Sequence, residues 1–209
     1  MRSSENKPNR TAQHIDEAVK VLERGGIISF PTETYYGLGV NPFDHSAVKR
    51  LFQLKKRAQS KPILVLIPHI DMLPLLVATV PELYQPLIEE FWPGPLTLIF
   101  PARKTVDPLL TGNTGTIGIR ISSNQVVNNI LQKWGNPVTA TSANISNHAP
   151  AQSYNEVMAY FGNKVDQIID GGDSPAGLCS TIVTSHQGKL LEIRKGQIPF
   201  EMIDKVTKI

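Results

Sequence analysis

Residues 25–39 read GGIISFPTETYYGLG, and this stretch contains the transition that decides the fold. Residues 27–30 form a short apolar run that predicts a buried strand, and Pro31 ends it. The polar, glycine-containing residues 32–39 follow directly. A strand that runs into such a loop is where α/β proteins bind their ligands. The sequence therefore predicts an α/β fold with a candidate binding loop after its first strand.

Helical and strand patterns alternate on both sides of this loop. Residues 11–23 carry apolar side chains at helical spacing, with Thr11 as the expected N-cap, and Asp44 is expected to cap a second helix. We expect further strands at residues 63–67, 96–100, 116–121, 138–140, 167–170, 180–183 and 190–194, and further helices at residues 71–90, 124–132 and 154–161. This order predicts an α/β domain. For the whole fold we expect a twisted mixed β-sheet with flanking helices and an open, positively lined cavity where the loops converge.

Length and composition favour one domain. The chain has 209 residues, of which 41% are hydrophobic and 19% charged, as in a globular protein with a single core. We expect a flexible N-terminus at residues 1–10, one folded domain at residues 11–200 and a C-terminal tail at residues 201–209. Neither a secretory signal nor an apolar run of roughly 18 residues is present, so we expect a cytoplasmic protein without a membrane partner. The single cysteine, Cys179, argues against disulfides and zinc fingers.

Several catalytic signatures are absent from the sequence. It contains neither the P-loop pattern G-x-x-x-x-G-K-[ST] nor H-E-x-x-H, and its five histidines are scattered, so no protein metal site is predicted. The stretch of residues 172–176 lacks the final glycine of a serine-hydrolase nucleophile elbow. The formal net charge of +3 is low for a dedicated nucleic-acid binder. The placement of individual charges must therefore carry the functional argument.

One cation cluster follows the second predicted helix. Lys55, Arg57 and Lys61 are either a solvated helix end, where cations meet the last carbonyls, or a clamp for an anion. Two arginines, Arg120 and Arg194, come at the ends of apolar strand patterns. A buried arginine needs a partner, which can be a bound anion or a salt bridge to Glu33, Asp170 or Glu192. The pattern alone leaves both alternatives open.

Hydroxyl and amide side chains follow three other predicted strands. They are Thr32 and Thr34, the loop of residues 139–144, and Ser180 with Thr181. Such residues commonly close turns. They also bind nucleotides and small substrates through neutral hydrogen bonds. Spacing does not decide between these interpretations.

Taken together, these loops closely resemble the YrdC-like family of threonylcarbamoyl-AMP synthases, in its short single-domain form. The resemblance rests on GGIISFPTETYYGLG, the K-x-R of residues 55–57 followed by Lys61-Pro62, FWPGPLTLIF (91–100), TIGIRI (116–121), TSANIS (141–146), CSTIV (179–183) and LEIRKG (191–196). These segments run in family order across nearly the whole chain. Their combination is far more specific than any one of them.

The resemblance implies a reaction and a site. L-threonine, bicarbonate and ATP, the last accompanied by Mg²⁺, would give L-threonylcarbamoyl-AMP and pyrophosphate, for the N6-threonylcarbamoyladenosine modification of tRNA. Downstream tRNA threonylcarbamoyl-transferase proteins would be partners. The family pattern places Thr34, Arg120, Ala140 and Ser180 at threonine, with Arg120 facing its carboxylate. It places Lys55, Arg57, Lys61, Thr116, Ser142, Asn144, Pro150 and Arg194 at ATP.

Two anions, the carbamate and the α-phosphate, must meet in this reaction. Cations placed in advance would oppose their repulsion, so we expect Lys55 and Arg57 to act as electrostatic catalysts and not as acids or bases. The chain departs from the family pattern at three positions. Leu66 stands where relatives often carry His, Ser122 where they often carry Pro, and Thr184 where they often carry Asp.

Two alternative functions remain at this stage. The first is a module that binds double-stranded or pre-ribosomal RNA without catalysis, which the low net charge and the lack of aromatic stacking motifs disfavour. The second is the carbamoyl-phosphate chemistry of hydrogenase-maturation carbamoyltransferases. Those proteins carry zinc-finger cysteines, and this chain has one cysteine.

Overall fold

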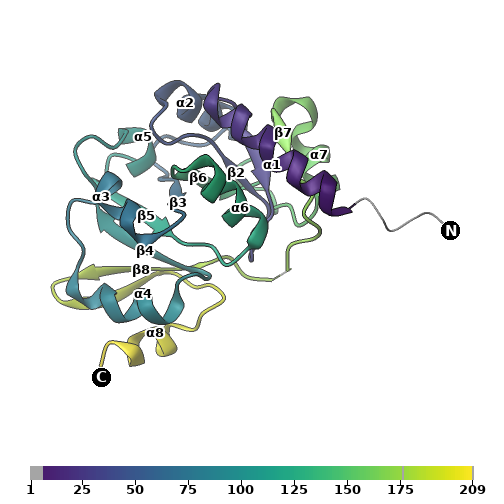
Figure 1. The fold of residues 1–209 in the computed structure, drawn as a ribbon. Helices are drawn as coiled ribbons and strands as arrows, with labels where there is room; N and C mark the ends of the chain where they lie inside the picture. The colour runs from purple at the N-terminus through teal and green to yellow at the C-terminus, as the bar shows by residue number, and fades with distance from the viewer. Residues whose placement is uncertain (1–6, 176, 209) are drawn as a thin grey trace.

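A computed structural model describes residues 7–175 and 177–208 (Figure 1). Its centre is a mixed, nine-stranded sheet of order β7-β1-β2-β6-β3-β5-β4-β8-β9. The strands are β1 (Ile28–Phe30), β2 (Gly37–Gly39), β3 (Leu64–Leu66), β4 (Leu96–Pro101), β5 (Thr116–Arg120), β6 (Val138–Ser142), β7 (Gln167–Ile168), β8 (Thr181–His186) and β9 (Lys189–Arg194). Three neighbouring pairs are parallel, β1 with β7, β3 with β5 and β4 with β8, and the other pairs are antiparallel.

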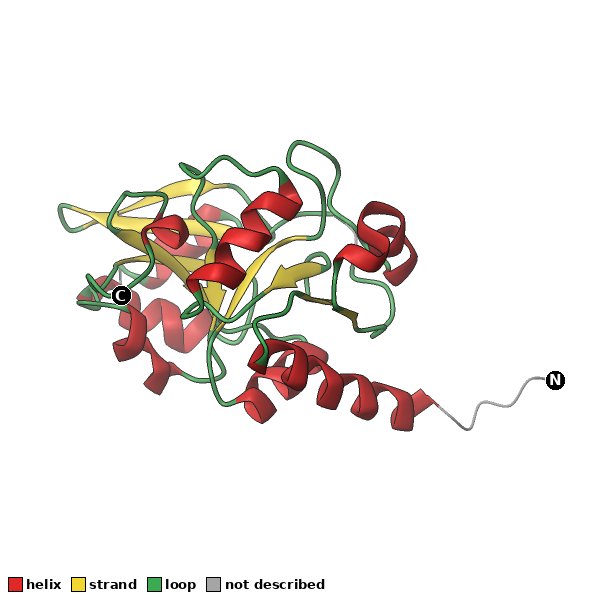
Figure 2. Ribbon diagram, turned by 90° about the horizontal axis from the view of Figure 1, so that it is seen from above, coloured by secondary structure: helices red, strands yellow, loops and turns green. Residues whose placement is uncertain are grey.

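Helices cover both sides of this sheet (Figure 2). They are α1 (Lys7–Glu23), α2 (His45–Lys55), α3 (Leu73–Leu76), α4 (Gln85–Phe91), α5 (Pro108–Thr111), α6 (Gln125–Trp134), α7 (Tyr154–Phe161) and α8 (Phe200–Val206), with short 3-10 turns at Ile70–Met72, Glu82–Tyr84 and Gly162–Lys164. Side-chain caps begin several of them. Asp44 Oδ1 accepts from Ala47 N at 3.0 Å, as expected from the sequence, and Asn124 Oδ1 accepts from Val126 N at 2.9 Å at the start of α6.

Two apolar clusters hold the helices against opposite faces of the sheet. One contains residues of α2, α3, α4 and α8 together with the alternate strand residues Leu98, Ile119 and Val183. The other joins α1 and α6 to the strand residues Ile28 and Val138. In the central strands, the residues that alternate with the first cluster point toward the face that carries α1 and α6. Those two helices leave part of that face open, and the cavity described below lies there.

The expected order of elements is confirmed, with differences in detail. β2 lies where the sequence predicted only a loop, because the three residues Gly37–Gly39 pair with β1 and β6 on either side. The helix expected at residues 71–90 is broken into two short helices and two 3-10 turns. Prolines at the first turns of α3 and α4 suit helix starts and not helix interiors.

Both ends of the chain correct the expectation of loose termini. α1 begins at Lys7, so Thr11 lies inside the helix and does not cap it. Of the expected flexible residues 1–10, residues 1–6 lie outside the described part of the chain. At the other end, most of the expected tail forms α8, whose Ile203 is fully buried in the core. α8 lies beside α4 (Figure 1). Within the described ranges, no helix has both the length and the apolar character needed to cross a bilayer.

Candidate active site

A cavity of about 410 Å³ opens on the sheet face that α1 and α6 leave uncovered. Strand alternation explains its floor: Thr97 and Ile99 of β4 face the cavity, whereas Leu96, Leu98 and Phe100 belong to the core on the other face. Loops after β1 and α2 complete its wall. Of the residues that the family pattern places at threonine or ATP, those in the cavity lining are Thr34, Arg57, Lys61, Thr116, Arg120, Ala140, Ser142, Ser180 and Arg194.

Three guanidinium groups meet at this cavity, those of Arg57, Arg120 and Arg194. Burial, and next the positive charge of Arg194, lower the pKa of Arg57. Burial also lowers the pKa of Arg194, whose neighbour Arg120 adds to the effect and whose neighbour Cys179 opposes it. Arginine stays protonated in proteins all the same. The cavity therefore gathers fixed positive charge that a bound anion would neutralise.

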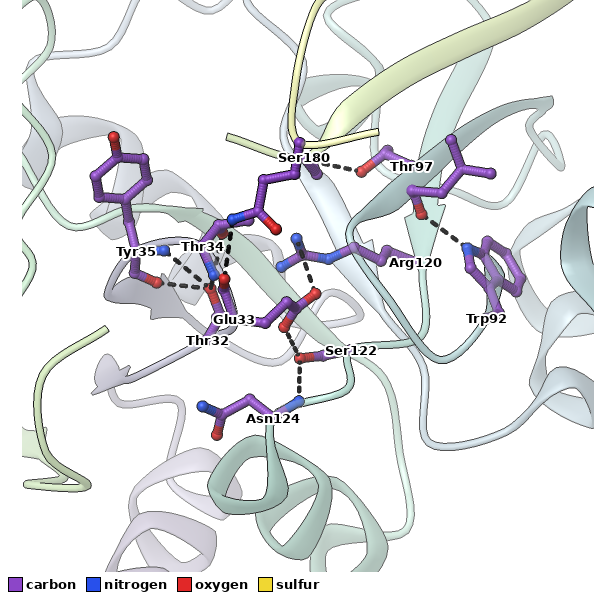
Figure 3. A network of polar contacts seen from close by, with 12 residues as sticks. Thr32, Glu33, Thr34, Tyr35, Trp92, Thr97, Arg120, Ser122, Asn124 and Ser180 are labelled. Atoms are coloured by element: carbon purple, nitrogen blue, oxygen red, sulfur yellow. Dashed lines mark hydrogen bonds and ion pairs between the residues drawn. The ribbon is translucent and has the colours of Figure 1, made fainter. Parts of the chain in front are cut away.

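Arg120, the last residue of β5, forms the salt bridge to Glu33 that the sequence allowed. It also lines the cavity, where an anion could bind. Its NH1 lies 3.3 Å from Glu33 Oε1, and its side chain is 4% exposed. Yet its Nε has no hydrogen-bond partner among residues 7–175 and 177–208. Burial lowers the pKa of Arg120, and the Glu33 carboxylate raises it. The guanidinium is thus compensated by one carboxylate oxygen (Figure 3). Its buried Nε has no acceptor in the described part of the chain, and Arg120 is one of the residues that line the cavity.

Arg194, the last residue of β9, is fixed by the start of β8. Its Nε and NH2 donate to Ser180 O at 3.1 and 2.9 Å, and its NH2 also lies 2.9 Å from Ser180 Oγ. Ser180 Oγ in turn lies 2.9 Å from Thr97 Oγ1 (Figure 3). A hydroxyl pair therefore lies next to a cation inside the cavity.

Arg57 and Lys61 lie on the loop that follows α2. Arg57 Nε donates to Lys61 O at 3.1 Å and its NH2 donates to Pro62 O at 2.8 Å. These bonds close the loop on itself and hold the guanidinium at the cavity wall. Both Arg57 and Lys61 line the cavity, where an anion could reach them, and the anion clamp stays a prediction.

Lys55 is held by the protein itself and lies outside the cavity lining, and its expected role at the phosphates stays a prediction. Its side chain is buried, and its Nζ donates to Ser142 O and to both Asn144 O and Asn144 Oδ1, the last two at 2.8 and 3.0 Å. An ammonium group has three donors, so the loop after β6 takes all of them. Burial, and next the charge of Arg57, lower the pKa of Lys55 to about 7. Lys55 is a positioning residue for residues 142–144 and lies outside the cavity lining.

Two other expected ATP residues also lie outside the lining. The Asn144 side chain is turned inward, where its Oδ1 accepts from Ser142 Oγ at 2.7 Å and its Nδ2 donates to His148 O. Pro150 is half-buried, beside Ala151, which hydrogen-bonds Tyr36 and Ala143 through its backbone. A role for Pro150 at ATP stays a prediction.

The hydroxyl groups after β1 form a small network of their own. Thr32 Oγ1 lies 2.9 Å from Thr34 Oγ1, and it accepts from Thr34 N at 3.1 Å. Both residues line the cavity, as does Tyr35, whose hydroxyl donates to Gly177 O at 2.6 Å. These two threonines therefore both close the turn and line the cavity.

Three polar residues that the sequence pattern did not indicate also line the cavity. Thr97 was assigned only to a strand, although it is the one hydroxyl residue in an otherwise apolar run and shares its side of β4 with Ile99. Ser60 and Cys179 also line the cavity. Strand alternation could have found Thr97. No local signal distinguishes Ser60 from an ordinary loop residue.

The three departures from the family pattern lie in different surroundings. Leu66 is fully buried in the apolar cluster of α1 and α6, opposite Arg120 in the register of β3 with β5. Thr184 lies in β8 opposite Ile99 of β4. Ser122 is fully buried and donates through Oγ to Glu33 Oε2.

Comparisons with known proteins agree with this geometry. A model of the Sua5/YciO/YrdC family, described as "Telomere recombination", matches residues 20–196. A "Threonylcarbamoyl-AMP synthase" of Pyrococcus abyssi is 35% identical over 90% of this chain, which spans 56% of that relative's length. A protein of the same name from Coxiella burnetii strain RSA 493 is 33% identical over 87% of this chain and 97% of its own length. The structure titled "Crystal structure of P. abyssi Sua5 complexed with L-threonine" superposes with a TM-score of 0.89 at 35% identity, covering 92% of this chain and 56% of that one.

The open α/β sheet gathers guanidinium and hydroxyl groups into one cavity, and this lining is chemically suited to small anionic molecules. The chain belongs to the Sua5/YciO/YrdC family. The family and the fold expected from the sequence motifs are both confirmed.

Proposed function

We propose that this protein is an enzyme that makes L-threonylcarbamoyl-AMP from L-threonine, bicarbonate and ATP, releasing pyrophosphate. The two relatives described above carry the name threonylcarbamoyl-AMP synthase, and the superposed structure is titled as a complex with L-threonine. The product would serve tRNA threonylcarbamoylation through downstream transferase proteins.

One observation carries the proposal: Arg57, Arg120 and Arg194 line the same cavity. Their side chains come from a loop and two strands that are far apart in sequence. A phosphate chain and an amino-acid carboxylate are the anions of this reaction. Guanidinium groups bind both through paired hydrogen bonds.

The proposed chemistry needs charge neutralisation more than proton transfer. The amine of threonine and bicarbonate give a carbamate and water; a carbamate oxygen then attacks the α-phosphorus of ATP, and the bond to the leaving pyrophosphate breaks. Arg57 and Lys61 would hold the phosphates, whereas Arg120 would hold the threonine carboxylate. Cations fixed in advance lower the repulsion between the two anions, and holding them in line lowers the barrier further.

Mg²⁺ would enter with ATP in this scheme. The cavity offers guanidinium, ammonium and hydroxyl groups, whereas Mg²⁺ prefers carboxylate and phosphate oxygens. The phosphate oxygens of ATP would therefore carry the ion, and it would offset part of their charge during the reaction.

A direct assay tests the proposal. The protein is incubated with ATP, bicarbonate and threonine, and the products are separated and identified by mass spectrometry; serine and glycine replace threonine in parallel reactions. We expect the threonylcarbamoyl adenylate together with pyrophosphate, only when all three substrates are present. The absence of threonine-dependent product, together with tight and salt-dependent binding of double-stranded RNA, would support the RNA-binding alternative instead.

A further inference from the structure

We propose that Ser122 is a positioning residue for the substrate-binding guanidinium of Arg120. It holds the Glu33 carboxylate in an orientation that compensates the charge of Arg120 without occupying the donors that face the cavity. The inference rests on the proposed function, because it takes the ligand of Arg120 to be the carboxylate of an amino acid.

The Ser122 hydroxyl has a defined direction. Asn124 N donates to Ser122 Oγ at 3.1 Å, which occupies a lone pair of that oxygen. The hydroxyl proton is directed to Glu33 Oε2, which as a carboxylate oxygen can only accept. Ser122 is fully buried, so water does not compete for this bond. Figure 3 shows the Glu33 carboxylate between Ser122 and Arg120.

The Glu33 carboxylate is divided between its two neighbours. Oε2 is taken by Ser122, while Oε1 lies 3.3 Å from Arg120 NH1. Oε1 has no hydrogen-bond partner in the described part of the chain, and the same is true of Arg120 Nε. The pair therefore attracts by charge but lacks the forked, two-bond geometry of a tight arginine–carboxylate pair.

Loss of the Ser122 hydroxyl would change this division. Oε2 would lose its donor in largely buried surroundings, which is costly for a carboxylate. The Arg120 guanidinium already lies 3.3 Å from Oε1, so we expect Glu33 to turn toward it and form the forked pair. That pair would use the same donors that a substrate carboxylate needs. Neither Ser122 nor Glu33 lines the cavity, so the effect must pass through Arg120.

The test is the steady-state kinetics of Ser122→Ala in the full-length protein. Because removal of a hydrogen bond to a charged group commonly changes binding by about tenfold or more, we expect the KM for threonine to rise about tenfold. The kcat and the KM for ATP should stay within about twofold, since the phosphate-side cations are untouched. Ser122→Thr keeps the hydroxyl and is expected to keep the KM for threonine within about threefold.

Two matched controls separate positioning from a loss of stability. Ser123→Ala removes the hydroxyl of an exposed neighbour and should change nothing. Asn124→Ala removes the side chain that caps α6 and destabilises the protein, yet it leaves the Ser122 to Glu33 bond in place. We expect Asn124→Ala to lower the melting temperature without raising the KM for threonine. An equal rise in KM for Asn124→Ala and Ser122→Ala would overturn the inference.

A double-mutant cycle tests the path through Glu33. If Ser122 acts by holding that carboxylate, Ser122→Ala should change the KM for threonine by less than about twofold in a Glu33→Gln background. An undiminished effect of Ser122→Ala in that background would contradict the proposed path.

Calorimetric titration with L-threonine distinguishes this inference from the proposed function. Tight threonine binding by wild type and about tenfold weaker binding by Ser122→Ala supports both. Equal binding by the two proteins overturns the role of Ser122 and leaves the proposed function standing. No threonine binding and no adenylate product from wild type overturns the proposed function, and the inference falls with it.

Discussion

Two buried cations, one at the end of α2 and one at the end of β5, are held in opposite ways. Lys55 gives all three of its donors to the loop of residues 142–144. Arg120 lines the cavity and is paired with one carboxylate oxygen, and its buried Nε has no acceptor among the residues that the structure describes. The role of a cation near this site therefore depends on how many of its donors the protein itself uses. A fully used cation supports structure, and a partly used one is available to a ligand.

Replacement of Arg120 tests the second half of this comparison and has the largest expected effect. Arg120→Ala removes the proposed partner of the threonine carboxylate and leaves the buried Glu33 carboxylate unpaired. We expect kcat/KM for threonine to fall about 1,000-fold, or about 4 kcal/mol of barrier. Rates of adenylate formation measure it. The exposed Arg103→Ala is the control, and activity close to wild type in Arg120→Ala would refute the assignment.

Replacement of Lys55 tests whether a cation whose donors are all used by the protein contributes to stability. Lys55→Met keeps the apolar stem but removes the ammonium donor from Ser142 O, Asn144 O and Asn144 Oδ1. Ser142 O keeps the bond from Asn144 N and Asn144 Oδ1 keeps the bond from Ser142 Oγ, so Asn144 O loses its donor altogether. We expect the free energy of unfolding to fall by about 2 kcal/mol, measured by urea denaturation, because an unsatisfied buried acceptor costs about 1–3 kcal/mol. Lys49→Met, on the exposed face of the same helix, should stay within about 0.5 kcal/mol of wild type. A stable Lys55→Met protein with much reduced activity would restore Lys55 as a catalyst.

Arg57 should behave as a ligand-facing cation, unlike Lys55 two residues before it. Arg57→Ala is expected to lower kcat/KM for ATP about 10-fold to 100-fold, because the phosphates lose a charged donor. Threonine binding measured by calorimetry should change little. A kcat/KM for ATP within about threefold of wild type would show that Arg57 does not act on the phosphates.

The pH dependence of stability gives the smallest effect and sharpens the comparison. Burial lowers the pKa of Lys55 to about 7, below its value in the unfolded chain. Below pH 7 the residue is charged in both states and the folded state bears the full cost of burying that charge. Above pH 7 the folded protein releases this proton while the unfolded chain keeps it, so stability rises with pH. We expect wild type to gain about 1 kcal/mol relative to Lys55→Met between pH 7 and pH 8. Parallel stability curves for the two proteins would contradict the lowered pKa.

Much of the cavity could be predicted, because its residues follow strands whose apolar patterns are strong. Thr34, Arg120 and Arg194 were each identified at a strand end or on a loop that follows a strand, and all three line the cavity. The inward direction of Lys55 was missed, although its helix contained the signal. Val48, Leu51 and Lys55 lie at helical spacing on the buried face of α2, so Lys55 continues an apolar stripe that points into the protein.

Local pattern determined the order of helices and strands, the capping of α2 by Asp44, and the family motifs that follow the strands. Periodicity and capping depend on near neighbours in the chain, so the sequence alone contains them. The tertiary structure decided that β2 joins the sheet, that α8 completes the core and that Lys55 faces Asn144 while Arg120 faces the cavity. These outcomes depend on hydrogen bonds and burial between residues distant in sequence, and only the packed chain brings those residues together.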